Sequence, residues 1–206
     1  MAINLVKGQR LELDSGLSKL KVEMGWALSE NARYDLDAST FLLGESGQVE
    51  NEYDFVFYGS PNKTTVDGVE RPCSVDMSVL GSVDDLGDDD ESGEGNEEIE
   101  VDLTKTSSNI KEILFTVSIY YNPNDPNDPQ RKFNFGQVRN AFIQIKNSLT
   151  NEIICRYDLD EDFSTSKGVE FGRLYRRGTE WKFQAVGESH ADGLLSICKK
   201  YASKFM

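Results

Sequence analysis

Polar and apolar residues alternate along most of this chain, as they do in β-strands that bury one face. The alternation is clearest in residues 5–41, where Leu20, Val22 and Met24 are separated by charged residues. Similar strand-like segments lie at 54–58, 75–80, 99–103, 113–120, 141–147, 153–159, 169–177 and 180–186. Helical spacing of apolar residues occurs only in residues 192–204. The pattern predicts an all-β fold, a single-domain β-sandwich of about ten strands with a short C-terminal helix.

One acidic segment interrupts the alternation. Residues 82–98, SVDDLGDDDESGEGNEE, contain nine carboxylates, three glycines and no basic residue. Neighbouring carboxylates repel one another by roughly 1 kcal/mol per pair even in water. Such a run is therefore either a solvated, disordered loop or a loop that a cation completes. The strand-like segments on both sides, and glycines that permit tight backbone turns, favour the cation.

A second acidic feature precedes the segment. Asp35 and Asp37 stand two residues apart at the start of a predicted strand, so their side chains point to the same face. Calcium takes six to eight oxygen ligands from carboxylates, amides and backbone carbonyls. Together with the acidic segment, Asp35 and Asp37 can supply such a set from two places in the chain. The spacing does not match an EF-hand, because the glycine at its sixth position is missing.

Charge and composition narrow the classes of partner. The 206 residues carry a formal net charge of −14, which argues against nucleic acid and against anionic membrane surfaces. We find no apolar run long enough for a signal peptide or a membrane-spanning helix. The three cysteines are odd in number and far apart, as free thiols in a reducing compartment are. These observations predict a cytoplasmic protein without an integral membrane segment.

Several motifs, in order along the chain, resemble those of the TerD family of tellurium-resistance and stress-response proteins. The motifs are YDLDASTF at 34–41, DFVFY at 54–58, FGQVRNAFI at 135–143, RYDLDED at 156–162, FGRLYRRG at 171–178 and EWKFQAVG at 180–187. The resemblance extends over nearly the whole chain, and it implies a single TerD-like domain over 1–206.

The resemblance also implies a calcium-binding β-sandwich that holds one or two ions. The family's ligand motifs map onto seven residues of this chain: Asp35, Asp37, Asp84, Asp85, Asn96, Glu97 and Glu98. The acidic loop departs from the family pattern, because residues 88–92 are extra and two family aspartates are replaced by Asn96 and Glu97. The loop at 122–132 is longer than is usual for the family. Protein partners in a stress or tellurite-resistance response are a further expectation.

Catalytic motifs are poorly represented. His190 is the single histidine and is expected to be a surface or capping residue and not a catalytic base. The cysteines are expected to be buried and inert. We therefore expect a calcium-dependent binding module and no enzyme. Two alternatives stay open at this point: a thiol-dependent enzyme acting on tellurium oxyanions, and a passive acidic scaffold.

Overall fold

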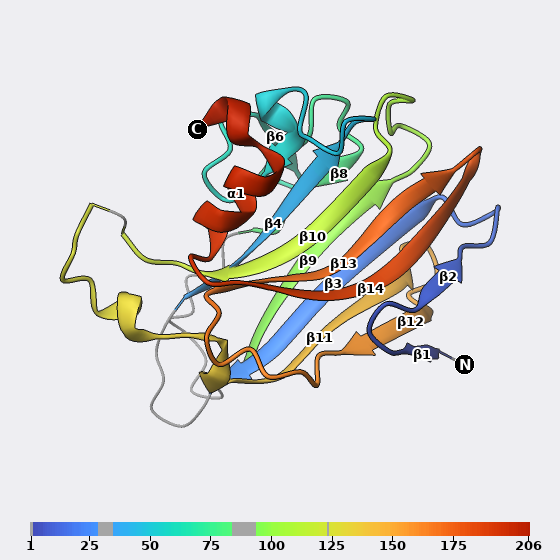
Figure 1. The fold of residues 1–206 in the computed structure, drawn as a ribbon. Helices are drawn as coiled ribbons and strands as arrows, with labels where there is room; N and C mark the ends of the chain where they lie inside the picture. The colour runs from blue at the N-terminus through green and yellow to red at the C-terminus, as the bar shows by residue number, and fades with distance from the viewer. Residues whose placement is uncertain (1, 29–34, 84–93, 123) are drawn as a thin grey trace.

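Two β-sheets pack face to face in the computed structural model, which describes residues 2–28, 35–83, 94–122 and 124–206 (Figure 1). Within those ranges the chain forms fourteen strands, one α-helix and four short 3-10 helices. The β-sandwich and the C-terminal helix that the sequence predicts are both present. The number of strands is larger than the predicted ten, because several connecting segments pair over two to four residues only.

The elements follow one another in this order. They are β1 Ile3–Leu5, β2 Arg10–Glu12, β3 Lys19–Leu28, β4 Leu36–Leu43, η1 Glu52–Asp54, β5 Phe55–Val56, β6 Lys63–Val66, β7 Val69–Pro72, β8 Val79–Leu80, β9 Glu94–Asp102, β10 Glu112–Ile119, η2 Pro129–Lys132, η3 Phe135–Gln137, β11 Val138–Asn147, β12 Ile153–Asp158, β13 Gly168–Arg177, β14 Glu180–His190, α1 Leu194–Tyr201 and η4 Ser203–Phe205.

The first sheet has the strand order β1-β12-β11-β3-β9-β8, and the second has the order β2-β14-β13-β10-β4-β5. Strand pairs within both sheets are antiparallel except β1 with β12, which run parallel. Strands β6 and β7 form a separate hairpin across Asp67-Gly68, a dipeptide whose positive φ angles suit a tight turn. Strands β4 and β9 thus belong to opposite sheets.

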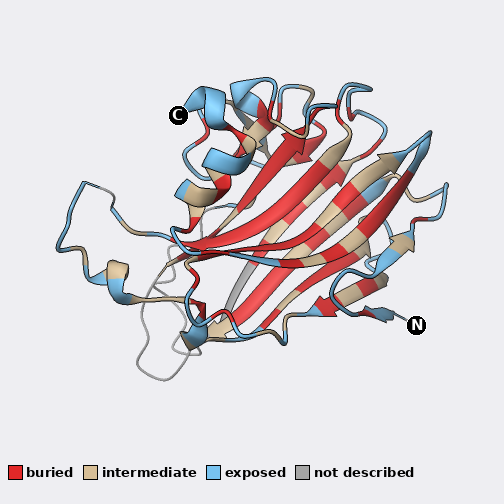
Figure 2. Cartoon of the chain, in the orientation of Figure 1, coloured by how far each residue is buried: buried red, intermediate tan, exposed pale blue. Residues whose placement is uncertain are grey.

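The core lies between the two sheets (Figure 2). In β3, the residues Leu20, Val22 and Met24 are fully buried, while Lys21 and Glu23 between them are not. Phe115 of β10 and Phe183 of β14 face them from the second sheet as members of the same cluster. The period of two in the sequence is therefore the burial pattern of β3, whereas β4 and β10 of the second sheet are buried at nearly every position.

A second, smaller apolar cluster fixes α1 to the outer face of the second sheet. Ile197 of α1 and Ala202 after it pack with Phe41, Leu43 and Leu114. The helix is shorter than the predicted 192–204. It begins after Gly193, whose φ of +61° is easily adopted only by glycine, and it ends where Ala202 takes φ −133°.

Three predicted boundaries are wrong. The segment 75–80 is strand only at its end, because Met77 takes φ +55° in a turn that Asp76 stabilises by accepting a hydrogen bond from the Ser78 N–H at 2.9 Å. The segment 54–58 is strand only at Phe55–Val56. The predicted acidic loop 82–98 is part strand, because β9 begins at Glu94.

The long loop at 122–132 is fastened by its own side chains. The Arg131 guanidinium donates to the carbonyl oxygens of Asp125 at 2.7 Å and Asn122 at 3.0 Å. Asp128 caps the short helix η2 by accepting from the Gln130 N–H at 2.8 Å. Arg131 also lies over the ring of Tyr121, 4.7 Å from its centroid.

In the part of the chain that the structure describes, no helix is both long enough and apolar enough to cross a membrane.

Replacing leucine by alanine should affect the free energy of unfolding very differently in the core and at the surface. Leu20→Ala removes a side chain that is 0 % exposed and should lower the free energy of unfolding by about 2–5 kcal/mol. Leu149→Ala, at a leucine that is 79 % exposed, should change it by less than about 0.5 kcal/mol. Urea denaturation of both variants measures the difference, and equal losses would contradict the assigned core.

Candidate metal centre

Two buried carboxylates from opposite sheets line one small cavity. Asp37 of β4 is 5 % exposed and Glu97 of β9 is 4 % exposed. The cavity is lined by Asp37, Ala38, Val56, Phe57, Tyr58, Pro72, Gly81, Ser82, Glu97 and Ile99. The structure therefore brings together one member of the predicted aspartate pair and one member of the acidic segment.

Strand register explains how each carboxylate reaches this place. Asp37 stands opposite Ser118 near the start of β4. Glu97 stands opposite Met24 of β3, in phase with Ile99 and Val101, which are buried in the core. Because side chains alternate along a strand, Glu97 points to the core side of β9. The core thus fixes the position of Glu97, whereas Asp37 alternates with the core-facing Leu36 and Ala38 and lies on the face of β4 that also carries Phe41 and Leu43.

The segment that follows β5 forms a further wall of the cavity, and Ser60 fixes its shape. The Ser60 hydroxyl accepts from the Phe57 N–H at 3.0 Å and donates to the Phe55 carbonyl at 3.0 Å. The rings of Phe55 and Phe57 stack with centroids 4.4 Å apart. Tyr58 continues the row to Tyr120, ring edge against ring face.

Arg71 connects the remaining wall of the cavity, formed by Gly81 and Ser82, to β9. This side chain is largely buried, and its guanidinium donates to the Gly81 carbonyl at 2.8 Å and to the Glu98 carbonyl at 3.2 Å. It also forms an ion pair with Glu100 at 2.5 Å. Gly81 and Ser82 are thereby held beside Glu97, and Ser82 accepts from the Glu98 N–H at 3.3 Å. Arg71 neutralises Glu100, which lies outside the cavity lining.

The other predicted ligands lie elsewhere or outside the described residues. Asp35 is not among the residues that line the cavity, and its N–H donates to the Gln130 side chain at 3.1 Å. Glu98 lies on the opposite side of β9 from Glu97 and pairs with Lys21 at 2.8 Å. Asn96 belongs to β9. Asp84 and Asp85 lie outside the described residues.

The size and chemistry of the cavity suit a single small cation. Its volume is about 10 Å³, which is room for about one water-sized particle. The lining side chains that can bind a cation carry oxygen, namely Asp37, Glu97 and Ser82, and none is histidine or cysteine. Oxygen ligands of this kind suit calcium or magnesium, and no zinc-type nitrogen or sulfur donor takes part.

The cysteines are poorly suited to nucleophilic chemistry. Burial raises the pKa of the Cys155 thiol to about 12 and that of Cys198 to about 11. Burial also raises the pKa of Cys73. At neutral pH these thiols are therefore protonated and weakly nucleophilic. The expectation that they are buried holds for Cys73 and Cys155, while Cys198 is half-buried.

The sequence did not lead us to predict a second polar cluster, which contains Glu170 and His190. His190 is 8 % exposed in β14 and contacts the buried Glu170, so the expectation of a surface histidine is wrong. The only signal was that Glu170 interrupts an apolar run, Val169 to Phe171, which is unusual for a charged residue in a central strand.

The wall beside the cavity carries a pH-sensitive carboxylate, Asp54, which lies just before β5. Burial, with the nearby charges of Asp76 and Glu50, raises the pKa of Asp54 from 3.8 to about 6. The Val75 N–H opposes this shift by donating to its carboxylate at 3.3 Å. Asp54 is therefore easier to protonate in the folded chain than in the unfolded chain.

Asp54 should make the protein less stable as pH rises from about 4 to 6, because the folded form holds a proton there that the unfolded form releases. Asp54→Asn removes the cost of the buried charge and should raise the free energy of unfolding at pH 7 by up to about 3 kcal/mol. The gain should shrink toward pH 4. Thermal unfolding measured at several pH values tests this, with Asp67→Asn at an exposed turn as the control. A gain that does not depend on pH would contradict the account.

Comparison with known proteins assigns the chain to a family. The TerD domain pattern matches residues 1–201. The chain is 38 % identical to general stress protein 16U of Bacillus subtilis, over 98 % of this chain and 97 % of that protein. It is 37 % identical to tellurium resistance protein TerD of Serratia marcescens, over the same shares of the two chains.

Solved structures agree on the fold. A homologue of the telluride resistance protein TerD from Streptomyces coelicolor superposes with a TM-score of 0.53 at 15 % identity, covering 85 % of this chain and 91 % of that one. A protein of unknown function, SAV2460, superposes with a TM-score of 0.57 at 19 % identity, covering 87 % and 93 %. The motifs along the sequence, the sandwich fold and the full-length match to named relatives lead to one conclusion: this chain belongs to the TerD family of tellurium-resistance and stress-response proteins.

Proposed function

We propose that this protein is a calcium-binding module of a tellurium-resistance or general stress response, and that calcium bound at Asp37 and Glu97 controls its contact with partner proteins. The response itself is proposed from the names of its relatives, a general stress protein and a tellurium resistance protein. Free thiols suit a reducing compartment, which supports a cytoplasmic location.

The observation that carries the proposal is the cavity shared by Asp37 and Glu97. Asp37 and Glu97 are each about 95 % buried and line the same cavity. A cation held there would be attracted strongly by both carboxylates, because little water screens charges in such a place. Since the two residues come from opposite sheets, the cation also joins the two sheets at this end of the sandwich.

Calcium fits this place better than magnesium. Calcium accepts six to eight oxygen ligands at flexible geometry, whereas magnesium demands a near-ideal octahedron and usually keeps several waters. A cavity with room for about one particle leaves little space for such waters. The acidic stretch 84–91 begins two residues after the cavity residue Ser82 in the sequence and contains further carboxylates.

The proposed mechanism is an ordering of the acidic segment by the ion. Ion binding adds attraction between the carboxylates of the segment 82–98 and the Asp37 end of the sandwich. A ligand that binds only the folded state stabilises it by about 2.7 kcal/mol at a hundredfold excess over the dissociation constant. Tyr58 lines the cavity, and Tyr58 and Tyr120 are both more than one third exposed. Exposed aromatic pairs are favoured in protein interfaces, so this pair is the proposed contact surface.

Two other functions remain candidates with less support. A thiol-dependent enzyme acting on tellurium oxyanions needs a thiolate at neutral pH, and the raised pKa values of all three cysteines oppose this. A passive acidic scaffold needs no cation, and two buried carboxylates at one cavity are not explained by it. We therefore propose a binding module in preference to an enzyme.

Calcium binding should depend on both cavity carboxylates. Asp37→Asn and Glu97→Gln keep side-chain shape but remove charge, so each should weaken calcium binding at least tenfold in calorimetric titration of the metal-stripped protein. Magnesium should bind far more weakly. Saturating calcium should raise the melting temperature of the wild-type protein by roughly 5–10 °C.

A matched control separates the site from bulk charge. Asp67→Asn lies in the exposed β6–β7 turn and should leave the affinity unchanged. Calcium affinity that is equal in all four proteins would rule out this centre.

The thiols should be unreactive in the folded state. Cys155 should react with an alkylating reagent at pH 7 at least a hundredfold more slowly than in urea-unfolded protein, because its pKa is raised to about 12. Mass spectrometry after timed alkylation measures the rate for each cysteine. A cysteine alkylated within seconds in the folded chain would revive the thiol-enzyme alternative.

A further inference from the structure

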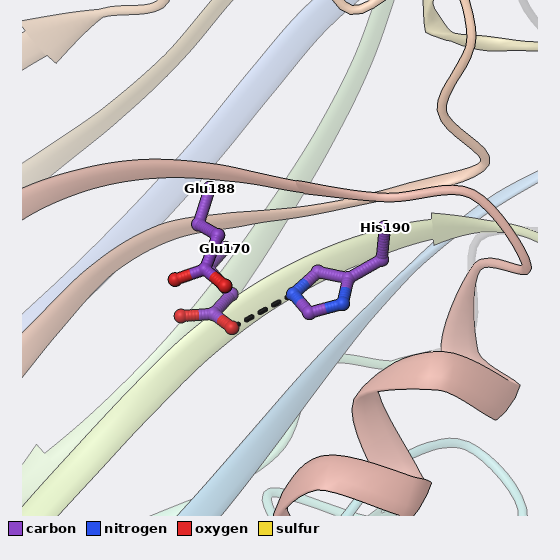
Figure 3. A group of neighbouring side chains, drawn as sticks. All are labelled: Glu170, Glu188 and His190. Atoms are coloured by element: carbon purple, nitrogen blue, oxygen red, sulfur yellow. Dashed lines mark hydrogen bonds and ion pairs between the residues drawn. The ribbon is translucent and has the colours of Figure 1, made fainter.

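A mixed cluster of two glutamates and a histidine lies on the face of the second sheet that α1 covers (Figure 3). Glu170 of β13 stands opposite Glu188 of β14, and His190 follows two residues later on the same face. The Nε2 atom of His190 lies 2.8 Å from Oε1 of Glu170. One oxygen of each carboxylate and one ring nitrogen all lie within 4.8 Å of one another.

A cation already occupies the centre of this cluster, and it belongs to the chain itself. The Lys200 ammonium of α1 lies 2.9 Å from Glu170 and 2.6 Å from Glu188. Tyr201 donates its hydroxyl to Glu170 at 3.0 Å. The Glu170 side chain is 3 % exposed. Burial raises its pKa, but the hydrogen bonds from His190 and Lys200 outweigh burial and lower it, so Glu170 is ionised at neutral pH.

We propose that Glu170, Glu188 and His190 form a binding site for a divalent transition-metal ion of the zinc class, which Lys200 occupies when no metal is bound. Zinc binds imidazole nitrogen and carboxylate oxygen readily, and three protein ligands leave a fourth position for water. Calcium prefers sites made of oxygen alone, so the histidine separates this site from the Asp37–Glu97 cavity in metal preference.

The geometry allows the exchange with small movements. Zinc bonds of about 2.0–2.2 Å place two ligand atoms about 3.5 Å apart. The largest present separation within the group is at most 4.8 Å, so a shift of little more than about 1 Å is needed. Glu188 has a side chain that is 53 % exposed and is free to make that shift. The Lys200 side chain is 37 % exposed and can withdraw into solvent as an ammonium.

Proton balance sets one condition on the histidine. Without metal, the Nε2–H of His190 donates to the ionised Glu170 carboxylate at 2.8 Å. The metal needs the lone pair of Nε2, so binding releases this Nε2 proton to solvent, and the neutral ring then carries its proton on Nδ1. Lys200 moves away as an ammonium and keeps its own proton. The positive charge that faces the two glutamates is then supplied by one divalent ion in place of one ammonium. Metal binding therefore removes one polar anchor between α1 and the sheet, while the contact of Tyr201 with Glu170 is retained.

The experiment is a titration of the full chain with zinc chloride, in saturating calcium, by calorimetry. Cobalt(II) replaces zinc in a parallel absorption measurement, because its visible bands report tetrahedral nitrogen and oxygen ligands. Lys200→Gln removes the competing charge but keeps a hydrogen-bond donor, so we expect zinc to bind at least tenfold more tightly. His190→Gln removes the nitrogen ligand, so we expect at least tenfold weaker binding and loss of the cobalt bands.

Two controls guard against binding elsewhere. Cys198→Ser removes the thiol that lies on the same helix and should leave zinc affinity unchanged. Asp37→Asn should affect calcium and leave zinc unchanged. Should His190→Gln fail to fold, the tighter binding of Lys200→Gln decides the question.

Three results would overturn the proposal. They are zinc affinity that does not differ between wild type and Lys200→Gln, zinc binding that survives His190→Gln, and zinc binding that Cys198→Ser abolishes. Lys200 would then serve only to fasten α1 to the sheet. Faster amide exchange of residues 194–201 on adding zinc to the wild-type protein, absent in Lys200→Gln, supports the exchange of Lys200 for metal.

Discussion

The structure depends on how a sandwich built from apolar strands buries acidic side chains. Asp37 comes from β4 of one sheet and Glu97 from β9 of the other, and both are more than nine-tenths buried. Removing an ionised carboxylate from water costs several kcal/mol even after the protein relaxes. The large core cluster, to which β3, β9, β10 and β14 all contribute, stabilises the fold enough to keep these groups in place.

The charges of the sandwich are balanced in different ways from one site to the next. Glu98 and Glu100, which point away from the core, pair with Lys21 and Arg71. Glu170 is buried, but Lys200 and His190 contact it directly. Lys21, Arg71 and Lys200 thus offset part of the repulsion that a net charge of −14 brings to this chain.

Alternation along the sequence was enough to predict the sandwich, the long strands and the terminal helix, because a buried face imposes a period of two. The short strands were not predictable in the same way. Pairing over two residues, as at Phe55–Val56 and Val79–Leu80, depends on contacts with distant strands and leaves little local pattern. Met77 shows the limit clearly, since a methionine with positive φ has no local signature.

The candidate calcium site could be predicted only in part, because the sequence shows which residues are acidic but not which of them lie together. Asp37 and Glu97 were both among the predicted ligands, because acidic residues at the start of a strand and in an acidic run stand out in a sequence. Which of them meet could not be read from the sequence, since adjacent residues of a strand face opposite ways. Glu97 and Glu98 differ by one position, and only Glu97 reaches the cavity. The Glu170–His190 cluster needed the register of β13 with β14.

The most direct measurement is a crystal structure of the full chain grown with calcium, using anomalous scattering to locate the ion. The account predicts an anomalous peak about 2.3–2.6 Å from carboxylate oxygens of both Asp37 and Glu97. A peak at other residues, or none in crystals grown with saturating calcium, would contradict the claim that these two carboxylates form the calcium centre.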